Sequence, residues 1–222
     1  MRLTLFDLDH TLLPLDSDHA WGKFTVSLGW RDAEHFSRAN DQFYAQYQNG
    51  TLDIGEYIRF ATTALRERGL QQASQAHQRF MQAVIQPALH PCALELVRAH
   101  QAAGDVVVIV TATNDFITRP IAQAFGVTEL IATELERDAQ GNPTGAIQGT
   151  PSFRAGKVER VKQWLSARGQ SWSSVRHSTF YSDSINDLAL LEHVQLPVAT
   201  NPDARLREIA SARGWRILDL FE

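Results

Sequence analysis

The chain of 222 residues is long enough for one large domain, or for a core domain that carries a smaller inserted one. A net charge of −4 offers no general basic surface to a nucleic acid, and an apolar fraction of 44% is ordinary for a globular protein. A single cysteine excludes an internal disulfide, and the longest apolar run, Val106 to Val110, is far shorter than the roughly 20 residues that cross a bilayer.

The first predicted element is a buried strand over residues 3–8, an apolar run that ends in acidic side chains. It stands where a signal peptide would begin, so we expect a soluble, cytoplasmic protein that acts on a small molecule and binds neither nucleic acid nor membrane. The oligomeric state is left open.

Residues 17–86 contain no apolar run, and their hydrophobic side chains recur at helical spacing. The pattern predicts an all-helical block of about four helices. In the third of these, Asp53 is the expected N-terminal cap and Gly69 the expected stop, and the fourth helix is expected to end at Pro87.

Strand-like and helix-like segments alternate after residue 90, which predicts parallel strands joined by crossover helices. The strands are expected at 106–110, 130–133, 178–182, 196–199 and 216–218, and the helices at 93–103, 117–124, 157–167, 186–191 and 204–212. A turn signal at Gly141, Asn142 and Pro143 predicts a hairpin within residues 135–148. We therefore predict an α/β protein with a doubly wound parallel-sheet (Rossmann-like) core, residues 1–14 and 88–222, and an inserted all-helical cap, residues 15–87.

Polar side chains gather where the predicted strands end, and ligands of open parallel sheets bind at the carboxyl ends of the strands. These side chains are Asp7, Asp9, Thr111, Asp183 and Asp187, with Lys157 at the start of the helix that precedes the last pair. Carboxylates crowded at one rim repel one another unless a cation lies among them, and oxygen ligands favour Mg²⁺. A carboxylate beside Mg²⁺ and a lysine can attack a phosphate ester, because the cations screen the incoming dianion.

The pattern DLDHT at residues 7–11, Thr111, Lys157 and SDSIND at residues 182–187 resembles the four ordered motifs of the haloacid dehalogenase superfamily. The helical insert resembles the cap of its phosphoserine phosphatase-like group. The resemblance covers essentially the whole chain and implies a phosphatase that hydrolyses small phosphate monoesters. Every candidate also has a purely structural interpretation, such as a helix cap or a solvated turn, and Arg154 competes with Lys157.

The resemblance also implies a role for each matching residue. Asp7 would be the nucleophile that forms an aspartyl phosphate, and Asp9 the general acid and base. Thr111 and the backbone N–H of Ala112 would bind phosphate oxygens, and Lys157 would offset charge in the transition state. The Mg²⁺ ligands would be Asp183, the Asp7 carboxylate and the Asp9 carbonyl, with Asp187 and Asn186 in supporting positions.

Substrate recognition is expected in the first turn of the helical insert. Asp16 lies nine residues after Asp7, where phosphoserine phosphatases place an acid that holds the substrate ammonium. Asp18 and His19 are alternatives, and Asp16 is equally suited to cap the helix that follows.

An arginine that would bind a substrate carboxylate is absent from the position where the resemblance predicts it. Phosphoserine phosphatases carry an arginine on the third cap helix, where this chain has Ala61. Without that bidentate group, a phosphorylated amino alcohol such as histidinol phosphate is the favoured substrate over phosphoserine. The aromatic side chains of Trp21, Phe24 and Phe43 either stack on an imidazole or form the core of the insert.

Three other functions share parts of this pattern. A phosphoserine phosphatase and a phosphotransferase of the same family would use the same aspartyl phosphate. A phospho-accepting signalling domain also combines acidic residues, a threonine and a lysine on a doubly wound sheet. It lacks a helical insert after its first strand, which disfavours it here.

Overall fold

The computed structural model describes residues 1–221. Its central sheet has six parallel strands in the order β3-β2-β1-β6-β7-β8. Their bounds are Arg2–Phe6 for β1, Val106–Asn114 for β2, Glu129–Thr133 for β3, His177–Ser182 for β6, Leu196–Thr200 for β7 and Arg216–Leu218 for β8. The chain runs outward from β1 in one direction through β2 and β3, and in the other through β6 to β8. The strand order therefore reverses beside β1, where open α/β sheets bind their ligands. This is the predicted fold class.

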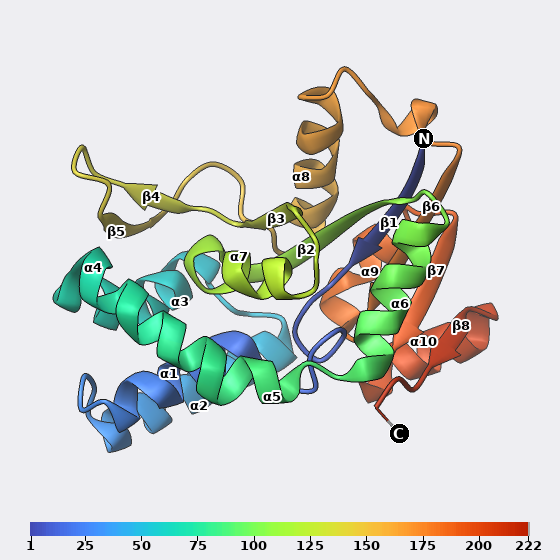
Figure 1. Cartoon of the computed structure of the whole chain (residues 1–222). Helices are drawn as coiled ribbons and strands as arrows, with labels where there is room; N and C mark the ends of the chain where they lie inside the picture. The colour runs from blue at the N-terminus through green and yellow to red at the C-terminus, as the bar shows by residue number, and fades with distance from the viewer. Residues whose placement is uncertain (222) are drawn as a thin grey trace.

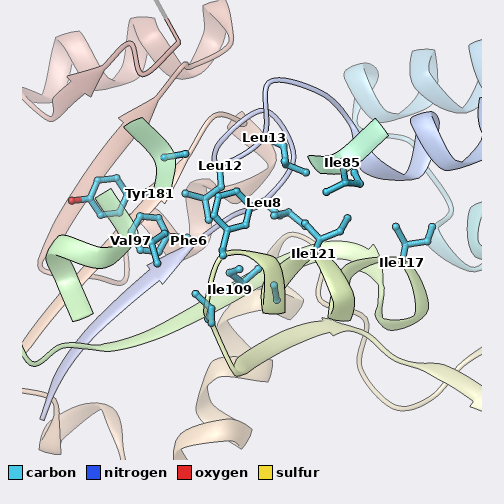
Figure 2. Packing of buried hydrophobic residues seen from close by; sticks show 14 of the residues in the cluster. Phe6, Leu8, Leu12, Leu13, Ile85, Val97, Ile109, Ile117, Ile121 and Tyr181 are labelled. Carbon is cyan, nitrogen blue, oxygen red and sulfur yellow. The ribbon is translucent and has the colours of Figure 1, made fainter. Parts of the chain in front are cut away.

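Helices cover both faces of the sheet because side chains on each strand alternate between two hydrophobic clusters. Phe6, Ile109 and Tyr181 point to one face, where they pack with Val97 and Ile121 (Figure 2). That face is covered by α6, Pro91–Ala102, and α7, Asp115–Ala124. On the other face, Leu3, Leu5 and Val108 pack against α8, Ala155–Ser166, α9, Leu188–Leu191, and α10, Ala204–Arg213.

Residues 17–88 form the predicted helical block, which lies to one side of the sheet in Figure 1. Its helices are α1, Ser17–Ser27; α2, Ala33–Asn49; α3, Ile54–Ala61; α4, Thr63–Phe80; and α5, Gln86–Ala88, with a π-helical turn over Met81–Ile85. Asp16, Asp32 and Asp53 each cap a helix by accepting a bond from the backbone N–H three residues on. Across residues 1–221, no helix is both long and apolar enough to span a membrane.

Two expected helix ends are wrong. The third helix ends at Ala61 and not at Gly69, because the chain turns at Thr62. Gly69 instead lies within α4, where its φ of +77° produces a kink that glycine tolerates. Pro87 does not end the fourth helix, since it occupies the first turn of α5, where a missing N–H costs no hydrogen bond.

Two smaller features complete the fold. Strands β4, Leu135–Arg137, and β5, Pro143–Ile147, form the predicted antiparallel hairpin. Leu135 and Ile147 pack against Ile58 and Leu65 of the helical block, so the hairpin holds that block from the side of β3 (Figure 1). Strand β2 extends beyond the predicted end at Val110, and its register with β3 shifts before Asn114. The polar residues that follow Val110 therefore lie on a strand and not in a loop.

Candidate active site

A buried ion pair network lies at the carboxyl ends of β1 and β6. Asp7 follows β1, and its backbone N–H donates to the Tyr181 carbonyl, 2.9 Å away. The Nζ of Lys157, on the first turn of α8, lies 2.7 Å from Asp7 Oδ1 and 2.7 Å from Asp187 Oδ2. Lys157 is only 2% exposed, so its charge is not screened by solvent. Sequence reasoning left Arg154 as a competitor, but Lys157 is the residue paired with Asp7.

The hydroxyl of Thr11 joins Asp183 to this network. Thr11 Oγ1 lies 3.1 Å from Asp183 Oδ1 and 3.4 Å from Asp7 Oδ2, and it accepts a hydrogen bond from the Asp183 backbone N–H. The pKa of Asp183 is well above its usual range, first because of burial and then because of the negative charges of Asp7 and Asp187. Burial also raises the pKa of Asp187 to about 6, against the attraction of Lys157. The single lysine therefore leaves this rim with excess negative charge.

These residues fit a magnesium ion. In the described part of the chain, no three His, Cys, Asp or Glu side chains are grouped as a metal site. Mg²⁺ needs fewer, since it commonly takes one or two carboxylates and keeps several waters. Asp7 and Asp183 are two carboxylates linked by one hydroxyl, and an ion beside them would relieve the repulsion that raises the pKa of Asp183.

Asp9 is held from two sides. Its Oδ1 accepts a hydrogen bond of 2.8 Å from the backbone N–H of Ser17, at the start of α1. Its Oδ2 accepts one of 2.8 Å from the Thr113 hydroxyl on β2. Burial first and the charge of Asp16 second raise the pKa of Asp9 well above its usual range. Sequence reasoning missed Thr113, although it lies two residues after Thr111 on the same strand and so faces the same side.

One cavity of about 740 Å³ brings the predicted site residues together. Its walls include all of them: Asp7, Asp9, Asp16, Asp18, His19, Thr111, Ala112, Lys157, Asp183, Asn186 and Asp187. The Thr111 hydroxyl accepts a hydrogen bond from the Thr113 backbone N–H, 3.2 Å away. The helical block contributes aromatic side chains to the wall, among them Phe43, Tyr44, Tyr47 and Tyr57.

The three aromatic residues weighed from the sequence have different surroundings. Trp21 and Phe24 pack in the hydrophobic cluster around Phe80, and only Phe43 lines the cavity. Within residues 1–221, the cavity wall contains no arginine, and Ala61 is not part of it.

The acidic residues near the start of α1 have separate surroundings. Asp16 caps the helix, since its Oδ1 accepts a hydrogen bond of 2.8 Å from the His19 backbone N–H. His19 Nδ1 lies 2.8 Å from the side-chain nitrogen of Asn40. Asp18 is buried, and one of its carboxylate oxygens has no hydrogen-bond partner among the described residues.

Two contacts connect the end of α2 to the segment after β6. The Tyr47 hydroxyl lies 2.8 Å from the Ser184 hydroxyl. Arg154 donates both to the Gly50 carbonyl, at 2.9 Å, and to the Asn186 side-chain oxygen, at 3.2 Å. No spacing in the sequence could reveal these pairs, because their members are more than 30 residues apart.

Comparison with known proteins gives the family and the fold of the chain. The family model of haloacid dehalogenase-like hydrolases matches residues 4–192. A histidinol-phosphatase of Neisseria meningitidis is 42% identical over 98% of this chain and 98% of its own length. A crystal structure of a protein of unknown function from Bordetella pertussis is 49% identical, covers 99% of both chains and has a TM-score of 0.93. A substrate-bound phosphoserine phosphatase is only 17% identical but shares the fold, with a TM-score of 0.69 over 98% of this chain and 92% of that one.

Proposed function

The chain belongs to the haloacid dehalogenase-like hydrolase family, and we propose that it is a Mg²⁺-dependent phosphatase that forms an aspartyl phosphate on Asp7. The observation that supports this most directly is the contact of Asp7 with Lys157 in a cavity shared with Asp9 and Asp183. A carboxylate, a fixed cation and a second carboxyl group are the parts that phosphoryl transfer through an acyl phosphate requires. A signalling domain is not retained, because the family is one of hydrolases.

In the first half of the reaction, an oxygen of Asp7 attacks phosphorus and the bond to the ester oxygen breaks. The carboxyl group of Asp9 gives its proton to the leaving oxygen, which departs as an alcohol. Thr113 and Ser17 hold Asp9 in one orientation for this transfer. Lys157 stays protonated beside Asp7 and offsets the negative charge that develops on the phosphoryl group.

In the second half, the Asp9 carboxylate takes a proton from a water molecule whose oxygen attacks phosphorus. The bond between phosphorus and the Asp7 oxygen breaks, inorganic phosphate leaves, and both carboxyl groups return to their starting states. Thr111 and the Ala112 backbone N–H bind phosphate oxygens in both halves. Asp187 holds Lys157 in position throughout, through the 2.7 Å contact with its Nζ.

We propose that Asp7, Asp183 and the backbone carbonyl of Asp9 hold the Mg²⁺. The ion supplies positive charge that lets the anionic phosphate approach an anionic nucleophile.

The proposed leaving group is an amino alcohol, and histidinol phosphate is the favoured substrate. Three observations support this: a relative 42% identical is named a histidinol-phosphatase, no arginine among the described residues lines the cavity to bind a carboxylate, and Asp16 and Asp18 line it instead. We also propose that residues 15–87 act as a cap that excludes water from a core of residues 1–14 and 88–222.

A direct test compares phosphate release from histidinol phosphate and from phosphoserine, with and without Mg²⁺. We expect turnover of histidinol phosphate, reversible loss with a chelator, and a fall of at least about 10³-fold in Asp7→Asn, which lacks the nucleophile. Asp32→Asn is the matched control, because asparagine also caps a helix and Asp32 lies outside the cavity wall.

Three outcomes would contradict parts of the proposal. Full activity in Asp7→Asn would exclude the aspartyl phosphate. Equal rates on histidinol phosphate and phosphoserine would remove the argument from the missing arginine. Transfer of phosphate to an added alcohol at the expense of hydrolysis would instead identify a phosphotransferase.

A further inference from the structure

Asp18 is a buried carboxylate in the cavity wall that takes no part in the chemical steps proposed above. It is 5% exposed, and its Oδ2 atom has no hydrogen-bond partner among the described residues. Leaving a buried charged oxygen without a partner is costly, so such atoms in a cavity wall commonly mark the position of a ligand donor.

Among the described residues, no ion pair is made to the carboxylate of Asp18. The Tyr57 hydroxyl lies close enough to the carboxylate to lower its pKa, that is, to favour its charged form. The positive charge of Arg31 acts on Asp18 from a guanidinium that donates to the Phe60 and Ala61 carbonyls and lies over the Phe36 and Phe60 rings. Within residues 1–221, no hydrogen bond or ion pair joins Arg31 to Asp18. Burial, followed by the charge of Asp16, raises the pKa of Asp18 to about 7.

Asp16 has a different use. Its side chain caps α1 through the His19 backbone N–H, a role that any uncharged capping residue such as asparagine could fill. Asp18 lies inside the first turn of α1 and caps nothing. Of the two carboxylates, only Asp18 combines deep burial with an oxygen that lacks a partner.

The wall beside Asp18 is aromatic. Phe43 and Tyr57 both line the cavity, and their rings meet edge to face with centroids 5.4 Å apart. The face of an aromatic ring attracts cations, and it can also stack on another flat ring. The pocket thus combines a carboxylate acceptor with aromatic surface, which suits a protonated nitrogen and not a second anion.

We infer that Asp18, which lines the cavity together with Tyr57, is the specificity-determining carboxylate that binds a protonated nitrogen on the leaving alcohol, and that Asp16 is not. This rests on the proposed function and deepens it, since it names the residue that distinguishes amine-bearing phosphate esters from others. A charge-assisted hydrogen bond of this kind contributes to binding of the intact substrate and of the transition state alike. Its loss should therefore appear mainly in KM.

The test measures kcat and KM for histidinol phosphate and for p-nitrophenyl phosphate, which has no amine. We expect Asp18→Asn to lower the ratio of the two kcat/KM values by about 10- to 100-fold, mostly through KM for histidinol phosphate. Tyr57→Phe should lower the same ratio by a few fold, about the effect of one neutral hydrogen bond. Asp32→Asn is the matched control and should leave the ratio unchanged, because asparagine keeps the cap of α2 and Asp32 lies outside the cavity wall. Asp16→Asn compares the two carboxylates and should change the ratio by less than about threefold, since asparagine keeps the cap of α1.

A binding measurement separates this inference from the proposed function. Calorimetry of histidinol phosphate with the Asp7→Asn variant, alone and combined with Asp18→Asn, requires no turnover. Weaker binding in the double variant supports the inference even if the reaction were of another kind. Equal losses for both substrates in Asp18→Asn, unchanged binding in the double variant, or a loss of selectivity in Asp16→Asn would each overturn it.

Discussion

Replacing Lys157 by methionine would remove the only cation from a buried cluster of carboxylates while keeping much of the side-chain volume. Lys157 is 2% exposed and lies 2.7 Å from both Asp7 and Asp187. Breaking a buried ion pair by removing one partner costs about 3–5 kcal/mol. We expect the free energy of unfolding of Lys157→Met, measured by urea denaturation at pH 7, to fall by about that amount.

The deficit should depend on pH. Burial already raises the folded-state pKa of Asp187 to about 6, and without the attraction of the lysine this pKa rises further, so the folded state binds a proton that the unfolded state does not. A carboxyl group whose pKa is raised in the folded state contributes stability that the protein loses as pH rises through that pKa. The deficit in the free energy of unfolding of Lys157→Met is therefore largest at pH 7 and shrinks toward pH 5. In the same variant, phosphate release should fall by about 10²–10³-fold.

Lys162→Met is the matched control, because Lys162 lies on the same helix and is exposed. It should change the free energy of unfolding by less than about 0.5 kcal/mol. A deficit in Lys157→Met below about 1 kcal/mol, or one that does not vary between pH 5 and 7, would refute the assignment of a buried charge network.

Three other predictions concern separate parts of the fold. Thr113→Val removes one of the two hydrogen bonds that orient Asp9, and we expect kcat to fall about tenfold in steady-state assays. An unchanged kcat would mean that the hydrogen bond from the Ser17 backbone N–H orients Asp9 by itself. Burial among aromatic rings lowers the pKa of His77 from 6.5 to about 4. The contribution of neutral His77 to the free energy of unfolding is therefore fully present above pH 6.5 and is lost as pH falls through 4. We expect the free energy of unfolding, measured by urea denaturation, to fall by about 3 kcal/mol over this pH range, and His77→Gln should abolish this pH dependence. A Cβ at Gly156 would lie 2.2 Å from the Pro151 carbonyl oxygen, so Gly156→Ala should lower thermal stability by about 2 kcal/mol despite its helix propensity; a stabilised variant would contradict the close approach.

The order and type of the elements could be predicted because hydrophobic periodicity reports how each segment is buried. Strand β2 could be recognised from Val106 to Val110, whereas its continuation through Thr111 and Thr113 could not, because polar residues at a strand end look like a loop. The ends of α3 and α4 were misplaced for a related reason. Gly69 interrupts the helical geometry, as its local preference predicts, but a helical segment follows it directly, and Leu65 and Ala73 on its two sides pack in one cluster with Leu135 and Ile147.

The amino-acid sequence alone indicated most of the residues that line the candidate cavity, although not Thr113, because acidic and hydroxyl side chains at strand ends follow a pattern that parallel sheets impose locally. It could not decide what each carboxylate does. Asp16 and Asp18 are two residues apart and chemically identical, yet one caps a helix and the other is buried with an oxygen that lacks a partner. Only the tertiary structure makes this distinction, because burial and hydrogen bonding depend on α3 and its Tyr57, which lies 39 residues further along the chain.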